Sequence, residues 1–173
     1  MNKIAVIYKS HYGTTKQYAE WIAEALNAPL FEASTIKPPQ LMDYDTIVYG
    51  GGLYAGGVLG AKLVTKNPTK SLVVFTVGLA DTKLTDFSNI LSKQFSQERF
   101  AKLKVFHLRG AIDYAKLSFL HKTMMGVVKR AAEKTPVDRR TNDDHLLLET
   151  YGKKIDFMDR TTILPLVEYV SAL

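Results

Sequence analysis

The sequence has 173 residues with 46% hydrophobic side chains, and its 23 lysines and arginines exceed its 17 aspartates and glutamates to give a formal net charge of +6. Length and apolar content predict a single domain, residues 1–173, with a sizeable core. Because the chain has no cysteine, disulfide scaffolds, thiolate zinc sites and cysteine nucleophiles are excluded. The four histidines show no metal-ligand spacing, so no metal is expected. The modest positive charge does not indicate a nucleic-acid partner.

Targeting and membrane-spanning signals are not apparent in the sequence. The apolar run Ile4–Ile7 is shorter than the apolar region of a signal peptide. No run approaches the ~20 apolar residues needed to span a bilayer. The sequence therefore predicts a cytoplasmic protein.

Short apolar runs rich in β-branched residues alternate with segments of helical periodicity. The predicted strands cover residues 4–8, 30–32, 46–49, 72–77 and 104–108. The predicted helices cover residues 15–27, 59–66, 85–95, 116–134 and 162–172. Almost wholly apolar strands are typical of parallel sheets that helices bury on both faces. The alternation therefore predicts an α/β fold with a parallel sheet between two helical layers.

A short polar loop follows the first predicted strand, where ligands of such sheets bind. Its residues are Ser10, His11, Tyr12, Gly13, Thr14 and Thr15. Three aliphatic hydroxyls and a glycine thus precede a helix N-terminus, whose unpaired N–H groups and partial positive charge suit a phosphate. The alternative is that Ser10 or Thr14 only caps the helix and Gly13 only makes the turn. The position after the first buried strand favours the phosphate site.

A glycine-rich segment, residues 50–57, follows the third predicted strand. Glycine loses the most entropy on folding, so a flat ligand lying against the backbone would explain the five glycines there. Tyr54 offers an aromatic face for stacking. The alternative is a glycine-rich turn with a surface tyrosine. The residues predicted to line the ligand are Gly51, Gly52, Leu53, Tyr54, Ala55, Gly56 and Gly57.

Both loops resemble those of flavodoxins. Residues 10–15 are similar to the flavodoxin phosphate loop, [ST]-x-T-G-x-T, which Ser10, Gly13 and Thr15 match and from which Tyr12 departs. Tyr54 and the glycines after it resemble the first flavin loop, where a backbone peptide flips to hydrogen-bond the reduced ring. The resemblance implies a flavodoxin-like three-layer sandwich, a five-stranded parallel sheet in the order 2-1-3-4-5 with helices on both faces, and bound FMN.

The end of the fourth predicted strand corresponds by its place to the second flavin loop. The resemblance there implies cofactor contacts by Thr76, Val77, Gly78, Leu79 and Asp81. Flavodoxins often stack a tyrosine from this loop on the outer face of the ring, and this loop has none. Tyr114 is a candidate to cover that face. No side chain stands out as an acid or base, although Asp81, Asp113 and Tyr114 lie near the expected site.

A basic segment follows the last predicted strand. Residues 116–140 hold seven lysines and arginines against two acidic residues, and the helix predicted within them has an apolar stripe. Two interpretations remain open. The helix either covers one face of the sheet with its charged side in solvent, or makes peripheral contact with an anionic membrane.

A second resemblance concerns activity. Residues 108–114, the basic helix and the Tyr54 loop resemble the flavodoxin-type, quinone-linked, oxygen-independent protoporphyrinogen oxidases, which are basic and membrane-associated. This implies an FMN-dependent oxidoreductase acting on a small apolar substrate, a quinone or a porphyrinogen. Flavodoxin carriers are usually strongly acidic, so an electron carrier between protein partners is the second hypothesis. A binding module that has lost FMN is the third.

Overall fold

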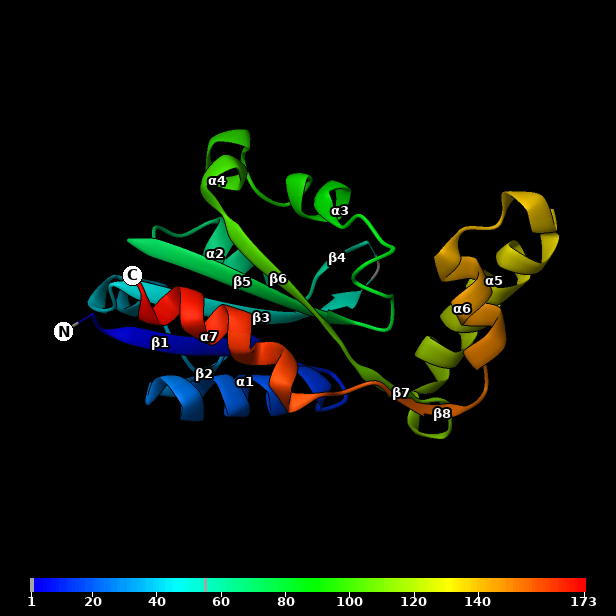
Figure 1. Cartoon of the computed structure of the whole chain (residues 1–173), viewed down its shortest axis with the longest axis horizontal. Helices are drawn as coiled ribbons and strands as arrows, with labels where there is room; N and C mark the ends of the chain where they lie inside the picture. The colour runs from blue at the N-terminus through cyan, green and yellow to red at the C-terminus, as the bar shows by residue number, and fades with distance from the viewer. Residues whose placement is uncertain (1, 55) are drawn as a thin grey trace.

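A parallel sheet forms the centre of the computed structural model, which describes residues 2–54 and 56–173 (Figure 1). Five strands pair in parallel in the order β2-β1-β3-β5-β6, and β4 pairs antiparallel to the end of β3. The strands are β1 (Ile4–Lys9), β2 (Leu30–Glu32), β3 (Thr46–Tyr54), β4 (Gly57–Val58), β5 (Ser71–Gly78) and β6 (Lys104–Arg109). The predicted α/β class and order of five parallel strands are confirmed. The two residues of β4 are too few to show periodicity, so this strand was not predicted.

Helices cover both faces of the sheet and bury two cores. One layer holds α1 (Thr14–Leu26) and α7 (Leu164–Ser171), and the other holds the 3₁₀ helix η1 (Pro38–Asp43), α2 (Lys62–Thr65), α3 (Ser88–Ser92) and α4 (Gln97–Lys102) (Figure 1). Neighbouring strand residues point to opposite faces. Val6 therefore shares a core cluster with Tyr18 of α1 and Leu166 of α7, whereas Ile7 shares the other cluster with Leu91 of α3.

The helix predicted over residues 85–95 is shorter in the structure. Only Ser88–Ser92 are α-helical there, and a separate helix, α4, begins after Ser96. The Ser96 hydroxyl accepts a hydrogen bond from the Arg99 N–H, which satisfies a donor in the first turn of α4. Phe87, Leu91 and Phe95 are all buried. Their spacing in the sequence therefore predicted the buried positions correctly but predicted too long a helix.

An unpredicted unit lies beyond the carboxyl ends of the strands (Figure 1). The chain leaves β6 through β7 (Ala111–Asp113) and returns through β8 (Lys154–Asp156), and these two strands form an antiparallel ribbon. Between them lie η2 (Tyr114–Lys116), α5 (Phe119–Lys134), η3 (Val137–Arg139) and α6 (Asn142–Thr150). We call residues 114–153 the cap. After β8 the chain returns to the sandwich through η4 (Arg160–Ile163) and α7.

Local signals define both helices of the cap. Ser118 caps α5 by accepting a hydrogen bond from the His121 N–H. The Arg140 guanidinium donates to the carbonyl oxygens of Ala132 and Thr135 at the end of α5, at 3.2 and 3.0 Å. Thr141 opens α6 in a capping box with Asp144. The turn between α5 and α6 is thus specified by side chains that bind helix ends.

Helix α5 does not cover a face of the sheet. It packs against α6 beside the sandwich (Figure 1), so the first of the two interpretations of the basic helix is wrong. The pattern of residues 116–134 indicated a buried apolar stripe, but Leu120, Val127 and Val128 of that stripe are exposed, whereas Ala132 is buried. None of the helices within residues 2–54 and 56–173 has the length and apolarity needed to cross a bilayer.

Candidate functional site

The loop between β1 and α1 leaves the N-terminus of α1 without a side-chain cap. Gly13 adopts a φ of +93°, and its N–H donates to the Ser10 hydroxyl at 3.0 Å. The predicted turn at Gly13 is therefore confirmed. The alternative that Ser10 or Thr14 caps the helix is wrong, because neither side chain bonds the first-turn N–H groups. Those donors point out of the helix end, where an anion would satisfy them.

The two threonines that begin α1 connect it to neighbouring strands. Thr14 donates from its hydroxyl to the carbonyl oxygen of Ala111 in β7, at 3.4 Å. Thr15 is buried, and a Cβ added to Gly52 of β3 would lie 3.5 Å from its hydroxyl oxygen. Gly52 therefore lies beside the first turn of α1. The structure thus brings the predicted phosphate loop and the predicted first flavin loop together. His11 and Tyr12 are exposed in this loop.

The first glycines of the run have packing roles within β3, which continues to Tyr54 instead of ending at Tyr49. A Cβ at Gly50 would lie 2.0 Å from the Phe75 ring, and one at Gly51 would lie 2.5 Å from Val58. No side chain fits at either position. The expectation that a ligand explains the whole glycine run is corrected here, because the chain's own strands explain Gly50 and Gly51.

The rest of the glycine-rich segment turns at the edge of the sheet. Gly56 is exposed with a φ of +75°, and a Cβ at Gly57 would lie 2.7 Å from the Gln94 amide nitrogen. The Gln94 amide oxygen accepts from the Val58 N–H at 2.7 Å, which holds β4. The Leu53 side chain lies 3.0 Å from the place of a Cβ on Gly78, so the two predicted flavin loops adjoin. Ala55, also predicted to contact the cofactor, lies outside the described residues.

The residues predicted at the end of β5 divide into two groups. Thr76 and Val77 are buried, and the Thr76 hydroxyl is hydrogen-bonded to Nδ1 of His107. The His107 ring stacks on Phe87 at 4.0 Å, and burial lowers the pKa of His107 to about 4. The side chain of Thr76 therefore bonds within the protein interior. Gly78, Leu79 and Asp81 are partly exposed beyond it, and the Asp81 carboxylate accepts from the Lys83 N–H at 2.9 Å.

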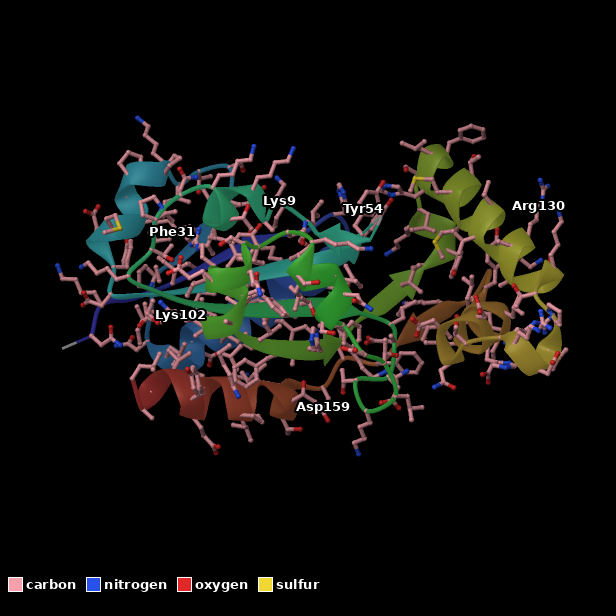
Figure 2. The ribbon with its side chains drawn as sticks, turned by 90° about the horizontal axis from the view of Figure 1, so that it is seen from above. Lys9, Phe31, Tyr54, Lys102, Arg130 and Asp159 are labelled. Atoms are coloured by element: carbon pink, nitrogen blue, oxygen red, sulfur yellow. The ribbon has the colours of Figure 1, made fainter. Side chains whose placement is uncertain are left out.

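His121 of α5 is a site residue that sequence reasoning missed. Its Nδ1 is hydrogen-bonded to the Tyr12 hydroxyl, and its Nε2 lies 3.0 Å from the Tyr54 hydroxyl. The His11 ring completes the cluster, with its centroid 5.3 Å from those of Tyr54 and His121. Figure 2 shows Tyr54 at the end of the sandwich that faces α5. Burial, His121 and Lys9 lower the pKa of His11.

The cap also contacts the segment between β5 and α3, four residues beyond the second predicted flavin loop. The Thr85 hydroxyl donates to the Asp143 carboxylate of α6 at 3.2 Å. The cap is therefore bonded to the phosphate loop and the first flavin loop through His121, and to Thr85 in the segment after β5 through Asp143.

Tyr114 has a structural role at the start of the cap, and Asp113 has one at the end of β7. Tyr114 is buried with its ring centroid 5.0 Å from that of Tyr151, and burial raises the pKa of its hydroxyl. Asp113 accepts from the Ala115 N–H at 3.0 Å and caps η2. This packing does not support the expectation that Tyr114 covers the outer face of a flavin ring.

Comparisons with known proteins agree with this architecture. Residues 5–138 match the family described as the flavodoxin domain. An uncharacterized protein of Methanocaldococcus jannaschii is 36% identical over 55 residues, which is 31% of this chain, and the chain spans only 37% of that relative's length.

Two solved structures illustrate the more distant similarity. Oxidised flavodoxin 2 from Bacillus cereus is 21% identical with a TM-score of 0.47, over 62% of this chain and 84% of that one. A flavoprotein in complex with FMN from Lactobacillus acidophilus NCFM is 14% identical with a TM-score of 0.40, over 63% of this chain and 93% of that one. The family match rests on the sequence itself and extends from β1 into η3. This chain belongs to the flavodoxin-domain family.

Proposed function

We propose that this protein binds FMN at the carboxyl ends of β1, β3 and β5, and that it is an FMN-dependent oxidoreductase acting on a small apolar substrate of the quinone or porphyrinogen type. FMN, once bound, supplies the electron transfer. The chain supplies binding, orientation and exclusion of water.

The phosphate position is supported by the uncapped first turn of α1. The N–H groups after Gly13 lack a side-chain partner, and the Ser10 and Thr14 hydroxyls lie on either side of Gly13 in the sequence. A phosphate there would accept hydrogen bonds from these donors and would interact favourably with the helix dipole. Lys9, at the end of β1, is bonded to Glu32 at 2.8 Å, so its charge is already paired.

The ring position is supported by the backbone beyond the ends of β3 and β5. Tyr54 offers its ring there, and Gly56, with its positive φ, has no atom within 4 Å of an added Cβ. The backbone at Gly56 is therefore free to change conformation beside Tyr54, where the flavodoxin-domain family holds a flavin ring. Gly78 and Leu79 would line the opposite side of the ring.

The observation that carries the proposal of an enzyme is the cap. It lies beyond the carboxyl ends of the strands and contacts the first flavin loop through His121 and the segment that follows β5 through Asp143. A protein partner approaching that edge would meet α5 and α6 first. A small molecule needs far less room, so the arrangement favours a small substrate over direct docking of a redox protein.

The outer surface of α5 supports peripheral contact with an anionic membrane, where apolar quinones reside. Phe119 is 87% exposed and Leu120 63% exposed. Exposed apolar side chains next to exposed lysines such as Lys122 are typical of helices that lie on anionic membrane surfaces. We propose that this surface lies on the headgroup region and presents the cap to the bilayer.

The activity is tested by comparing two electron acceptors. The purified protein is titrated with FMN, the bound flavin is photoreduced without oxygen, and either a soluble menaquinone analogue or cytochrome c is added. Prompt reoxidation of the reduced flavin by the quinone, with slow reoxidation by cytochrome c, would support an enzyme. The reverse preference would identify an electron carrier, and no flavin binding would overturn the whole proposal.

Membrane contact is tested separately by co-sedimentation with vesicles. The protein should pellet with vesicles that contain phosphatidylglycerol and remain in solution with pure phosphatidylcholine. The double variant Phe119→Ser, Leu120→Ser should lose most of that binding. Leu173→Ser is the matched control, since Leu173 is 55% exposed and lies at the C-terminus, away from the cap. Equal binding by both variants would contradict this contact.

A further inference from the structure

One continuous chain of hydrogen bonds joins the phosphate loop to the first flavin loop through the cap. The Ser118 N–H donates to the Tyr12 hydroxyl at 3.2 Å, and that hydroxyl is bonded to Nδ1 of His121. Nε2 of His121 is bonded to the Tyr54 hydroxyl at 3.0 Å, and the Tyr54 hydroxyl donates to Sδ of Met124 at 3.5 Å. The bonds therefore join the N-terminal half of α5 to both Tyr12 and Tyr54.

The donors and acceptors of this chain are consistent with one neutral tautomer of His121. A neutral imidazole has one donor and one acceptor nitrogen. If the Tyr12 hydroxyl donates to Nδ1, then Nε2–H donates to the Tyr54 oxygen, whose own proton goes to Met124. The Tyr12 oxygen also receives the Ser118 N–H. Every polar atom in the chain is satisfied in this arrangement.

The departure of Tyr12 from the flavodoxin phosphate loop then has a structural reason. A threonine at this position is too short to reach α5, whereas the tyrosine hydroxyl reaches His121. The rigid imidazole ring fixes the distance between the Tyr12 and Tyr54 hydroxyls. Edge-to-face packing of His121 with both tyrosine rings, at 5.5 and 5.2 Å between centroids, adds to this connection.

We propose that His121 is a positioning residue that couples occupation of the phosphate loop to the seating of the flavin ring at Tyr54. This inference rests on the proposed FMN site. A phosphate that orders residues 10–13 fixes Tyr12, Tyr12 fixes His121, and His121 fixes the ring of Tyr54.

The proposal distinguishes FMN from riboflavin, which has the same ring and no phosphate. Coupling through His121 operates only when the phosphate loop is filled. Loss of both His121 hydrogen bonds should therefore weaken FMN binding more than riboflavin binding. If His121 only packs the cap, its loss should weaken the binding of both flavins by the same factor.

The test measures the dissociation constants of FMN and riboflavin by flavin fluorescence quenching. His121→Phe keeps a ring in the cluster and removes both hydrogen bonds. It should weaken FMN binding about tenfold, and riboflavin binding by less than about twofold, since an ordinary hydrogen bond contributes about 1 kcal/mol. The matched control is His145→Phe, which changes an exposed histidine of α6 and should alter neither constant.

A second variant keeps the proposal falsifiable if His121→Phe does not fold, as judged by circular dichroism. Tyr12→Phe removes the same link from the phosphate loop and should reduce the preference for FMN over riboflavin to the same extent. The double variant should be no worse than either single one, because both break one pathway. Equal weakening of the two flavins, or additive effects, would overturn the coupling. Failure of the unmodified protein to bind FMN would instead overturn the proposed function.

Discussion

Arg109 stacks its guanidinium on the ring of Phe157, 3.8 Å from the ring centroid, and donates from Nε and Nη2 to the carbonyl oxygen of Leu79 at 3.2 and 3.1 Å. Phe157 follows the ribbon strand β8, and Leu79 begins the loop after β5. One side chain thus joins the return path of the cap to the second predicted flavin loop.

Arg109→Lys should loosen that loop, because a lysine cannot make the two fork-shaped hydrogen bonds or the same stacking contact. We expect a loss of about 1–2 kcal/mol in the free energy of unfolding, measured by urea denaturation. Amide hydrogen exchange should become faster over residues 79–86. Arg130→Lys on the exposed side of α5 is the control. Unchanged exchange in that segment would show that Arg109 does not hold the loop.

Gly13→Asp should abolish FMN binding while the sheet remains folded, because the new carboxylate would lie where the phosphate is proposed to bind. The free energy of unfolding should also fall by about 1 kcal/mol, since φ at this position is +93°. Gly152→Asp is a matched control, as Gly152 also has a positive φ with no atom near an added Cβ. Absorbance of the bound flavin and circular dichroism separate the two effects. A yellow Gly13→Asp protein would contradict the phosphate site.

Gly50→Ala should destabilise the fold strongly, because the added methyl group would lie 2.0 Å from the Phe75 ring. Overpacking of this kind typically costs about 1–3 kcal/mol. Phe75→Leu removes the ring and should lower the free energy of unfolding when introduced by itself. The double variant should lose less free energy of unfolding than the sum of the two single losses. Denaturant titration of the four proteins gives the coupling. Additive losses would mean that the two positions do not collide.

Acid should destabilise the protein through His107. Above pH 6.5 this imidazole is neutral in both the folded and the unfolded states, so its contribution is complete. As the pH falls from about 6.5 to about 4, His107 becomes protonated in the unfolded state but stays neutral in the folded state, where it is half-buried. The free energy of unfolding therefore decreases over this range. The loss should be on the order of 1 kcal/mol, since the ring is partly solvated. His107→Gln should flatten this part of the pH profile of unfolding free energy, whereas His145→Gln should not.

The sandwich was predictable from the sequence because its strands are apolar on both faces. Runs such as Val73–Val77 leave few alternatives to a buried parallel strand. The cap was not predictable to the same degree. Helix α6 has nine residues and only a weak apolar periodicity, and each ribbon strand has three. Elements this short are stabilised by tertiary contacts that no local pattern reports.

The site residues were predicted by searching the loops that follow strands. This approach could not identify His121, which lies on a helix far along the sequence. Tyr12 and His121 are 109 residues apart in the sequence, and only the path of the chain through β7 brings them together. The misinterpretation of Gly50 and Gly51 has the same origin. Their lack of side chains is required by Phe75 and Val58 on neighbouring strands, which a local sequence window does not contain.

The ribbon places Ala111 opposite Asp156, so the polypeptide departs from the sandwich and rejoins it at a single point. The entropy of closing a segment depends only weakly on its length. A change in the number of residues between β7 and β8 should therefore cost little closure entropy and should leave the register of β5 and β6 unchanged. An insertion or deletion there would reshape what can approach the carboxyl ends of the strands while the sheet keeps its pairing.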